Sequence, residues 1–201
     1  MPVARGKAAT ATAGATLLIV YCCGLGFDTW MVAYEQTSKK RGRVIANMGL
    51  FRACGYDINL QVFDEAKPKD CFSLLVAGVP GWVRAVQFFA IMCLVLLCVA
   101  SVLWCCIILL DKTAETRLMV PFLVLWTVTG LFSLIHLIIF ACNMRPGDLV
   151  REDGDPKSPS RDTFYWGAFY LHCVAVGIVN LLTLIGLCCL CCEILVALFG
   201  E

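Results

Sequence analysis

The sequence predicts a left-handed all-α transmembrane four-helix bundle that carries a small antiparallel β-sheet outside the membrane. Of its 201 residues, 60% are hydrophobic and only 15% are charged, whereas soluble domains average about 45–50% and about 25%. Four apolar runs each reach the length of roughly 20 residues that a membrane-crossing helix needs. The long polar segment between the first two runs, residues 31–84, contains the alternating pattern of a strand.

We expect the helices over residues 8–30, 86–110, 118–142 and 164–192, in a single domain that covers residues 1–201. The first run follows Arg5 and Lys7 but is long for a signal peptide and lacks a clean cleavage site, so it is interpreted as a transmembrane helix. Trp30 would then be an interfacial aromatic residue. Pro121 falls near the expected start of the third helix, where a missing N–H costs little.

The remaining segments are interpreted as loops or as an interfacial stretch. Residues 31–84 and 143–163 form two loops on one side, and residues 111–117 form a short charged turn on the other. Residues 194–200 are apolar and are expected to lie along the membrane surface. With an even number of spans, both termini lie on the side opposite the two loops.

The first loop has the period-2 pattern of a half-buried strand at Val44, Ala46, Met48 and Leu50. Leu60 and Val62 indicate a second, weaker strand. A sheet of so few strands is marginal alone in water. A disulfide across it would help to hold it closed.

Composition and motifs exclude several classes of function. The net charge of +1 gives no support to nucleic-acid binding. Both histidines, His136 and His172, lie in expected helices, so no catalytic set can be assembled from the loops. No phosphate-binding glycine loop and no zinc-ligand spacing lies outside the apolar runs. We therefore predict no enzymatic activity, no cofactor and no metal site.

The fourteen cysteines bear on orientation, because only Cys54 and Cys71 lie in a polar loop. The distribution of Lys and Arg alone favours termini outside. Two chemical arguments oppose it: a disulfide persists only in an oxidising compartment, and juxtamembrane cysteines are palmitoylated at the cytoplasmic face. We therefore expect cytoplasmic termini. The candidate palmitoylation sites are Cys105, Cys106, Cys188, Cys189, Cys191 and Cys192.

The first loop resembles that of the claudin superfamily. The family signature is a tryptophan, then Gly-Leu-Trp, then two cysteines, and here Trp30, Gly49-Leu50-Phe51, Cys54 and Cys71 match it, with Arg84 further on. The superfamily includes claudins, epithelial membrane and peripheral myelin proteins, and the gamma subunits of calcium channels and AMPA receptors. The chain departs from the pattern in three places: a phenylalanine replaces the second tryptophan, sixteen residues separate the cysteines, and no PDZ-binding tail follows the fourth helix.

The resemblance implies a claudin-like plasma-membrane protein of cell–cell contacts. Its loops would be extracellular, with a disulfide between Cys54 and Cys71, and it would form or regulate a paracellular barrier or ion pathway by self-assembly and trans pairing. The alternative is an auxiliary, gamma-like subunit that modulates an ion channel or receptor. The partners would be the lipid bilayer and a second copy or another membrane protein. By resemblance, the candidate ion-selectivity residues are Asp57, Asp64, Glu65, Lys67, Lys69 and Asp70.

Each of these sites has a second interpretation. Trp30, Leu50 and Phe51 could form a recognition surface or could seat the sheet on the membrane. The charged residues between the two cysteines could equally be a solvated loop. His136 and His172 are ionisable groups at membrane depth, which suggests function, but they could also be neutral histidines bonded to neighbouring helices.

Overall fold

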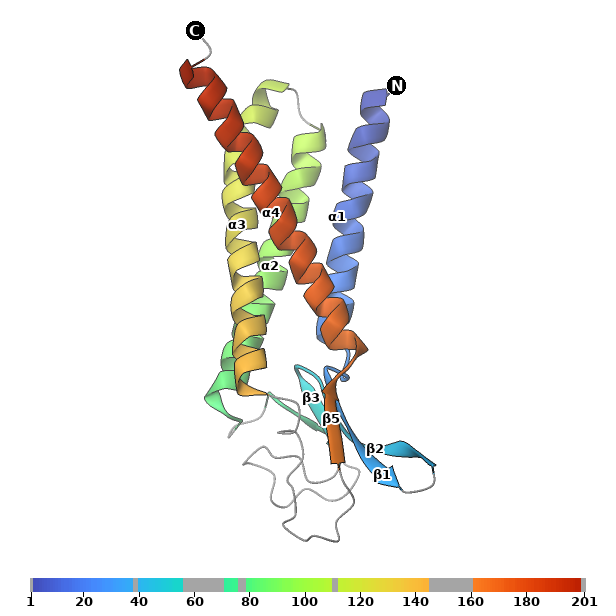
Figure 1. The fold of residues 1–201 in the computed structure, drawn as a ribbon. Coiled ribbons are helices and arrows are strands. Elements are labelled where there is room, and N and C mark those ends of the chain that lie inside the picture. Colours follow the sequence, from blue (N-terminus) through green and yellow to red (C-terminus); the bar gives the residue numbers. More distant parts are fainter. Residues whose placement is uncertain are drawn as a thin grey trace.

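The computed structural model describes residues 2–37, 40–55, 71–75, 79–109, 112–144 and 161–199. Four helices run side by side, and both termini lie at the end of the molecule away from the sheet (Figure 1). Each helix packs against two others, in the cyclic order α1, α2, α3, α4. The helices are α1 (Pro2–Gly26), α2 (Gly81–Leu109), α3 (Lys112–Asn143) and α4 (Gly167–Phe199).

Three helices are long and apolar enough to cross a membrane, over Gly81–Ile108, Leu118–Asn143 and Gly167–Cys192. In the part of α1 whose side chains are described, the apolar helix is shorter and covers Thr12–Gly26. Outward-facing positions of the long helices carry large apolar side chains, for example Val95 and Val99 on α2. A soluble bundle would place polar residues there, so these surfaces indicate a lipid bilayer.

The helix boundaries differ from expectation in several places. Helix α2 begins at Gly81, ahead of the expected residue 86, and α4 begins at Gly167, because Phe164 and Tyr165 of the expected span belong to a strand. The first helix ends at Gly26, and Trp30 lies beyond it. The third begins at Lys112, because the Lys, Ala, Glu and Arg of the expected charged turn are good helix formers. Pro121 consequently lies inside α3 instead of near its start. The fourth continues to Phe199 without a separate interfacial stretch.

The described strands form one five-stranded antiparallel sheet in the order β4-β3-β2-β1-β5. Strand β2 contains Val44, Ala46 and Met48 of the alternating segment recognised in the sequence, and Leu50 lies beyond its end. The other four strands, β1, β3, β4 and β5, were not foreseen. The expected strand at Leu60 and Val62 lies outside the described residues. The strands are β1 (Met31–Thr37), β2 (Lys40–Met48), β3 (Arg52–Gly55), β4 (Cys71–Ser73) and β5 (Arg161–Tyr165).

Strand β5 joins the two polar loops, because it comes from the second loop and pairs with β1 from the first. Met31 lies opposite Tyr165, and Glu35 opposite Arg161. The hydrophobic core is continuous from the sheet into the bundle, with Met31 and Met48 from the sheet and Val86 and Ala90 from α2 all buried. The sheet is therefore seated on the helix ends by packing.

Candidate functional site: the junction of sheet and helices

Trp30 is the centre of the junction and is completely buried, with 0% of its surface exposed. Its indole Nε1–H donates to the Gly24 carbonyl at 2.6 Å. Its ring lies edge-on to Phe140, with centroids 4.9 Å apart, and 5.1 Å from the His172 ring. The expectation of an interfacial tryptophan was wrong, because aromatic rings from α3 and α4 enclose the side chain and keep it from the headgroups.

The Trp30 backbone also connects three elements. Its N–H donates to the Met48 carbonyl at the end of β2, and its carbonyl accepts from the Trp166 N–H just before α4, at 2.9 and 2.8 Å. The residue therefore fixes the positions of α1, the sheet and α4 relative to one another.

Gly49 lies against the backbone that follows α1. A Cβ at this position would lie 2.6 Å from both the Asp28 Cα and the Phe27 carbonyl oxygen, closer than real Cβ atoms approach other atoms. Leu50 is buried beside it and Phe51 is half-buried. The Gly-Leu-Phe motif thus packs the sheet onto the helices. Neither Trp30 nor Leu50 is available as a recognition surface.

Gln87 holds two loops of the sheet against α2. Its side chain, 5% exposed, donates from Nε2 to the Leu50 carbonyl at 2.9 Å and to the Leu74 carbonyl at 3.2 Å. Both carbonyls would otherwise be buried acceptors that cost free energy. The Gln87 amide of α2 therefore fixes the position of both the Gly-Leu-Phe loop and the turn after β4.

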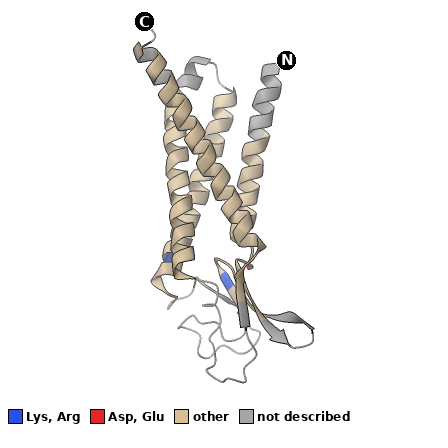
Figure 2. Cartoon of the chain, in the orientation of Figure 1, with Lys and Arg blue, Asp and Glu red and all other residues tan. Residues whose placement is uncertain are grey.

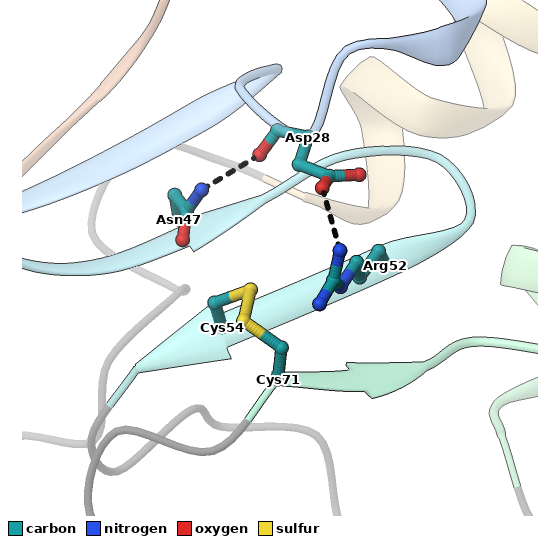
Figure 3. The surroundings of a disulfide bond; sticks show 5 residues. All are labelled: Asp28, Asn47, Arg52, Cys54 and Cys71. Atoms are coloured by element: carbon teal, nitrogen blue, oxygen red, sulfur yellow. Dashed lines mark hydrogen bonds and ion pairs between the residues drawn. A yellow bond between two sulfur atoms is a disulfide. The ribbon is translucent and has the colours of Figure 1, made fainter.

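Asp28 forms a polar contact at the rim of the junction (Figure 3). Its carbonyl accepts from the Asn47 amide at 3.2 Å, and its carboxylate lies 3.8 Å from the Arg52 guanidinium. The Arg52 side chain is 56% exposed, so this pair contributes less than about 1 kcal/mol. The contact orients β2 and β3 more than it stabilises them.

A disulfide joins Cys54 on β3 to Cys71 on β4 (Figure 3). The two residues are direct partners in the antiparallel pairing of these strands. Gly55, which follows Cys54, has a φ of 128°, a conformation that favours glycine. By loop-closure entropy, a bridge across this separation contributes about 3 kcal/mol.

His136 and His172 bind each other inside the bundle, with their Nε2 atoms 2.6 Å apart. His136 Nδ1 lies 3.0 Å from the Phe132 carbonyl and must donate to it. In the neutral tautomer its Nε2 is then the acceptor for the His172 Nε2–H. The expectation of histidines bonded to a neighbouring helix is confirmed.

The His172 ring is packed tightly on its other side. A Cβ on Gly24 would lie 2.9 Å from the His172 Cβ. The ring also lies 4.6 Å from that of Tyr21, between centroids. Within the described part of the chain, the buried His172 Nδ1 has no hydrogen-bond partner.

The structure places the other candidate residues at opposite ends of the molecule. Arg84 is exposed in the first turn of α2. The Lys and Arg residues drawn in blue lie at the sheet end of the molecule (Figure 2). The candidate ion-selectivity residues, residues 57–70, lie outside the described residues. The candidate palmitoylation cysteines are all exposed. They lie toward the C-terminal ends of α2 and α4, at the end of the molecule that also holds both chain termini (Figure 1). Among the described residues, no group of three or more His, Cys, Asp or Glu side chains could hold a metal ion.

Sequence reasoning missed Gln87 and Asn47. Gln87 is an uncharged polar residue at the start of an otherwise apolar span, and a buried amide there needs hydrogen-bond partners. That signal could have marked the residue, but its partners are backbone carbonyls, which no side-chain pattern reveals.

No protein-family model matches this chain, and no curated protein sequence matches it.

Proposed function

We propose that this chain is a claudin-like integral membrane protein of cell–cell contacts. It forms or regulates a paracellular barrier or ion pathway by self-assembly in the membrane and by pairing across cells. The observation that carries the proposal is a disulfide-tied antiparallel sheet fixed to one end of an apolar helix bundle. The residues that fix it, Trp30 and Gly49, are those that carry the resemblance.

The proposed arrangement places the sheet outside the plasma membrane and both termini in the cytoplasm. In it, α1 is the fourth span, beside the three helices of membrane-crossing length. The compartment outside the cell is oxidising, which the bond between Cys54 and Cys71 requires. The exposed cysteines at the other end would then face the cytoplasm, where S-acylation takes place.

The mechanism is non-enzymatic. The segment between Cys54 and Cys71 has both ends fixed, because β3 and β4 are paired and bridged. A surface whose ends are fixed loses less conformational entropy when it binds a neighbour. Loop surfaces would complement a neighbouring copy, and the loop charges, Asp57 to Asp70, would filter ions as rings of charged side chains do in pores.

The test is expression of the full chain in cells that lack junctional strands. The protein should concentrate at contacts between two expressing cells, form strands visible by freeze-fracture, and change the ionic conductance of a monolayer. A chain with Cys54→Ser and Cys71→Ser should lose contact enrichment. Cys98→Ser, which changes an exposed helix cysteine, is the matched control and should retain it.

Uniform surface staining without strands would contradict the proposal. If the protein instead co-purifies with a channel or receptor at fixed stoichiometry and ignores contacts, the auxiliary-subunit alternative replaces it.

A further inference from the structure

Exposed aromatic rings gather where the sheet meets the start of α4. The Phe164 and Trp166 side chains are 45% and 44% exposed, and Tyr34 on β1 is half-buried beside them. The Tyr34 ring centroid lies 5.8 Å from that of Phe164 and 5.9 Å from that of Trp166. Rings from β1, from β5 and from the residue before α4 therefore form one aromatic cluster.

The rings of this cluster do not cover one another. Tyr34 is tilted by 42° to Phe164 and by 50° to Trp166, so neither pair stacks face to face. The face of an aromatic ring carries the negative part of its quadrupole. The cluster thus presents electron-rich ring surface to the groups that surround the molecule at this level.

The aromatic cluster lies at the membrane surface. The apolar span of α4 starts at Gly167, directly after Trp166, and β5 leads straight into it (Figure 1). Tyr170, 58% exposed one turn into the span, continues the lipid-facing surface of α4 up to Trp166. Phe164 is two strand residues further out, which is about 7 Å, and the headgroup layer is about 5–7 Å thick. Lipid headgroups are therefore the groups that cover the cluster.

We propose that Tyr34, Phe164 and Trp166 form a binding site for the choline headgroup of phosphatidylcholine. A quaternary ammonium has no N–H to donate, and ring faces attract it when it lies within about 6 Å of the ring centroid. The primary ammonium of phosphatidylethanolamine is compact and strongly hydrated, as a lysine ammonium is. Ring faces replace its lost water poorly, so the cluster favours choline.

The junction fixes the position of this site. Tyr34 and Phe164 lie on paired strands that come from the two polar loops. The Trp166 backbone N–H donates to the carbonyl of the buried Trp30 at 2.8 Å. A headgroup held by all three rings would fasten the β1–β5 side of the sheet to the membrane surface. The site goes beyond the proposed function, because it needs only a bilayer around the helices.

The experiment uses the full chain in nanodiscs that hold equal amounts of phosphatidylcholine and phosphatidylethanolamine with identical acyl chains. Native mass spectrometry, after release of the protein from the disc, counts the lipids of each kind that remain bound. We expect the unchanged protein to retain phosphatidylcholine in about fivefold excess, the preference that an exposed cation–π contact provides.

Substitutions within the cluster test whether the rings cause the preference. Tyr34→Leu removes a ring but keeps an apolar side chain, so the two lipids should be retained in nearly equal numbers. Tyr34→Phe keeps the ring and should keep the excess. Phe164→Leu tests the site from β5 at an exposed position, and decides the matter if Tyr34→Leu fails to fold. Phe88→Leu, which removes an exposed ring from α2, is the matched control and should leave the excess unchanged.

Equal retention of the two lipids by the unchanged protein would overturn the inference and leave the rings as an ordinary interfacial belt. An excess of phosphatidylcholine that survives both Tyr34→Leu and Phe164→Leu also overturns it, because the lipid then binds elsewhere. Dimers that dissociate in these variants without a change in bound lipid would show that a second copy covers the cluster, which overturns it as well.

Discussion

Gly49 lies against backbone atoms of Asp28 and Phe27, so the position has no room for a side chain. Neither neighbour can move like the end of a flexible side chain, because both contacts are with the main chain at the end of α1. We predict that Gly49→Ala lowers the free energy of unfolding by about 1–3 kcal/mol, as overpacking does. Thermal denaturation in detergent measures the effect.

The matched control for Gly49 is Gly26→Ala, since a Cβ on Gly26 meets no atom within 4 Å. Its melting temperature should stay close to that of the unchanged protein. Equal melting temperatures for Gly49→Ala and Gly26→Ala would contradict the close approach of Gly49 to the backbone of Phe27 and Asp28.

Trp30 contributes both packing and a hydrogen bond. We predict that Trp30→Ala costs about 3–5 kcal/mol, the range for removal of a buried large aromatic side chain. Removal of the indole also leaves the Gly24 carbonyl without its hydrogen-bond donor. Trp166→Ala removes a tryptophan that is 44% exposed and should cost clearly less in the same denaturation assay. A larger loss of stability for Trp166→Ala than for Trp30→Ala would exclude Trp30 as the centre of the junction.

At the scale of elements, Gln87 connects α2 to two loops of the sheet. We predict that Gln87→Leu leaves the Leu50 and Leu74 carbonyls unsatisfied and destabilises the junction by about 1–3 kcal/mol. Hydrogen exchange should then be faster at the backbone amides of Leu74, which donates to the Phe51 carbonyl, and Gly49, which donates to the Arg52 carbonyl. Phe88→Leu, on an exposed position of the same helix, should leave the exchange unchanged.

The contact between α3 and α4 depends on the histidine pair. His136→Phe should leave the His172 Nε2–H unpaired and cost about 1–3 kcal/mol. A double-mutant cycle with His172→Phe should show a coupling free energy of at least about 0.5 kcal/mol, as residues in direct contact do. Additive effects of the two substitutions would contradict the bond between their Nε2 atoms.

The sequence predicts an element when its local pattern is enough to form it, and fails when the element depends on distant partners. Long apolar runs such as that of α2 can be found from length and composition, and β2 could be found from its alternation. Strands β1 and β5 could not, because Met31, Val32 and Ala33 are buried in succession and do not alternate. Their pairing also joins segments more than a hundred residues apart.

The junction was only partly predictable, because it too depends on contacts between segments far apart in the sequence. Trp30, Gly49 and Cys54 stood out in the sequence through the family resemblance. The surroundings of Trp30 are supplied by Phe140 and His172, on helices far along the chain. A tryptophan after an apolar run is therefore indistinguishable from an interfacial one until those helices are placed.

At the scale of the whole molecule, the two ends are chemically different. One end carries the sheet with the Cys54–Cys71 bridge, and the other carries the termini and the exposed cysteines of α2 and α4 (Figure 1). The proposed function requires the first end to face the exterior and the second to face the cytoplasm.

The most direct test is the sidedness of the thiols in intact cells, measured with a membrane-impermeant maleimide that adds mass to each cysteine it reaches. The test uses a Cys142→Ser background, because Cys142 is a free, exposed thiol in the last turn of α3 at the sheet end. We predict that Cys54 and Cys71 are labelled only after an impermeant reductant, and that Cys188 to Cys192 are not labelled from outside in either state. Labelling of Cys188 to Cys192 from outside, or of Cys54 and Cys71 without reduction, would contradict the account.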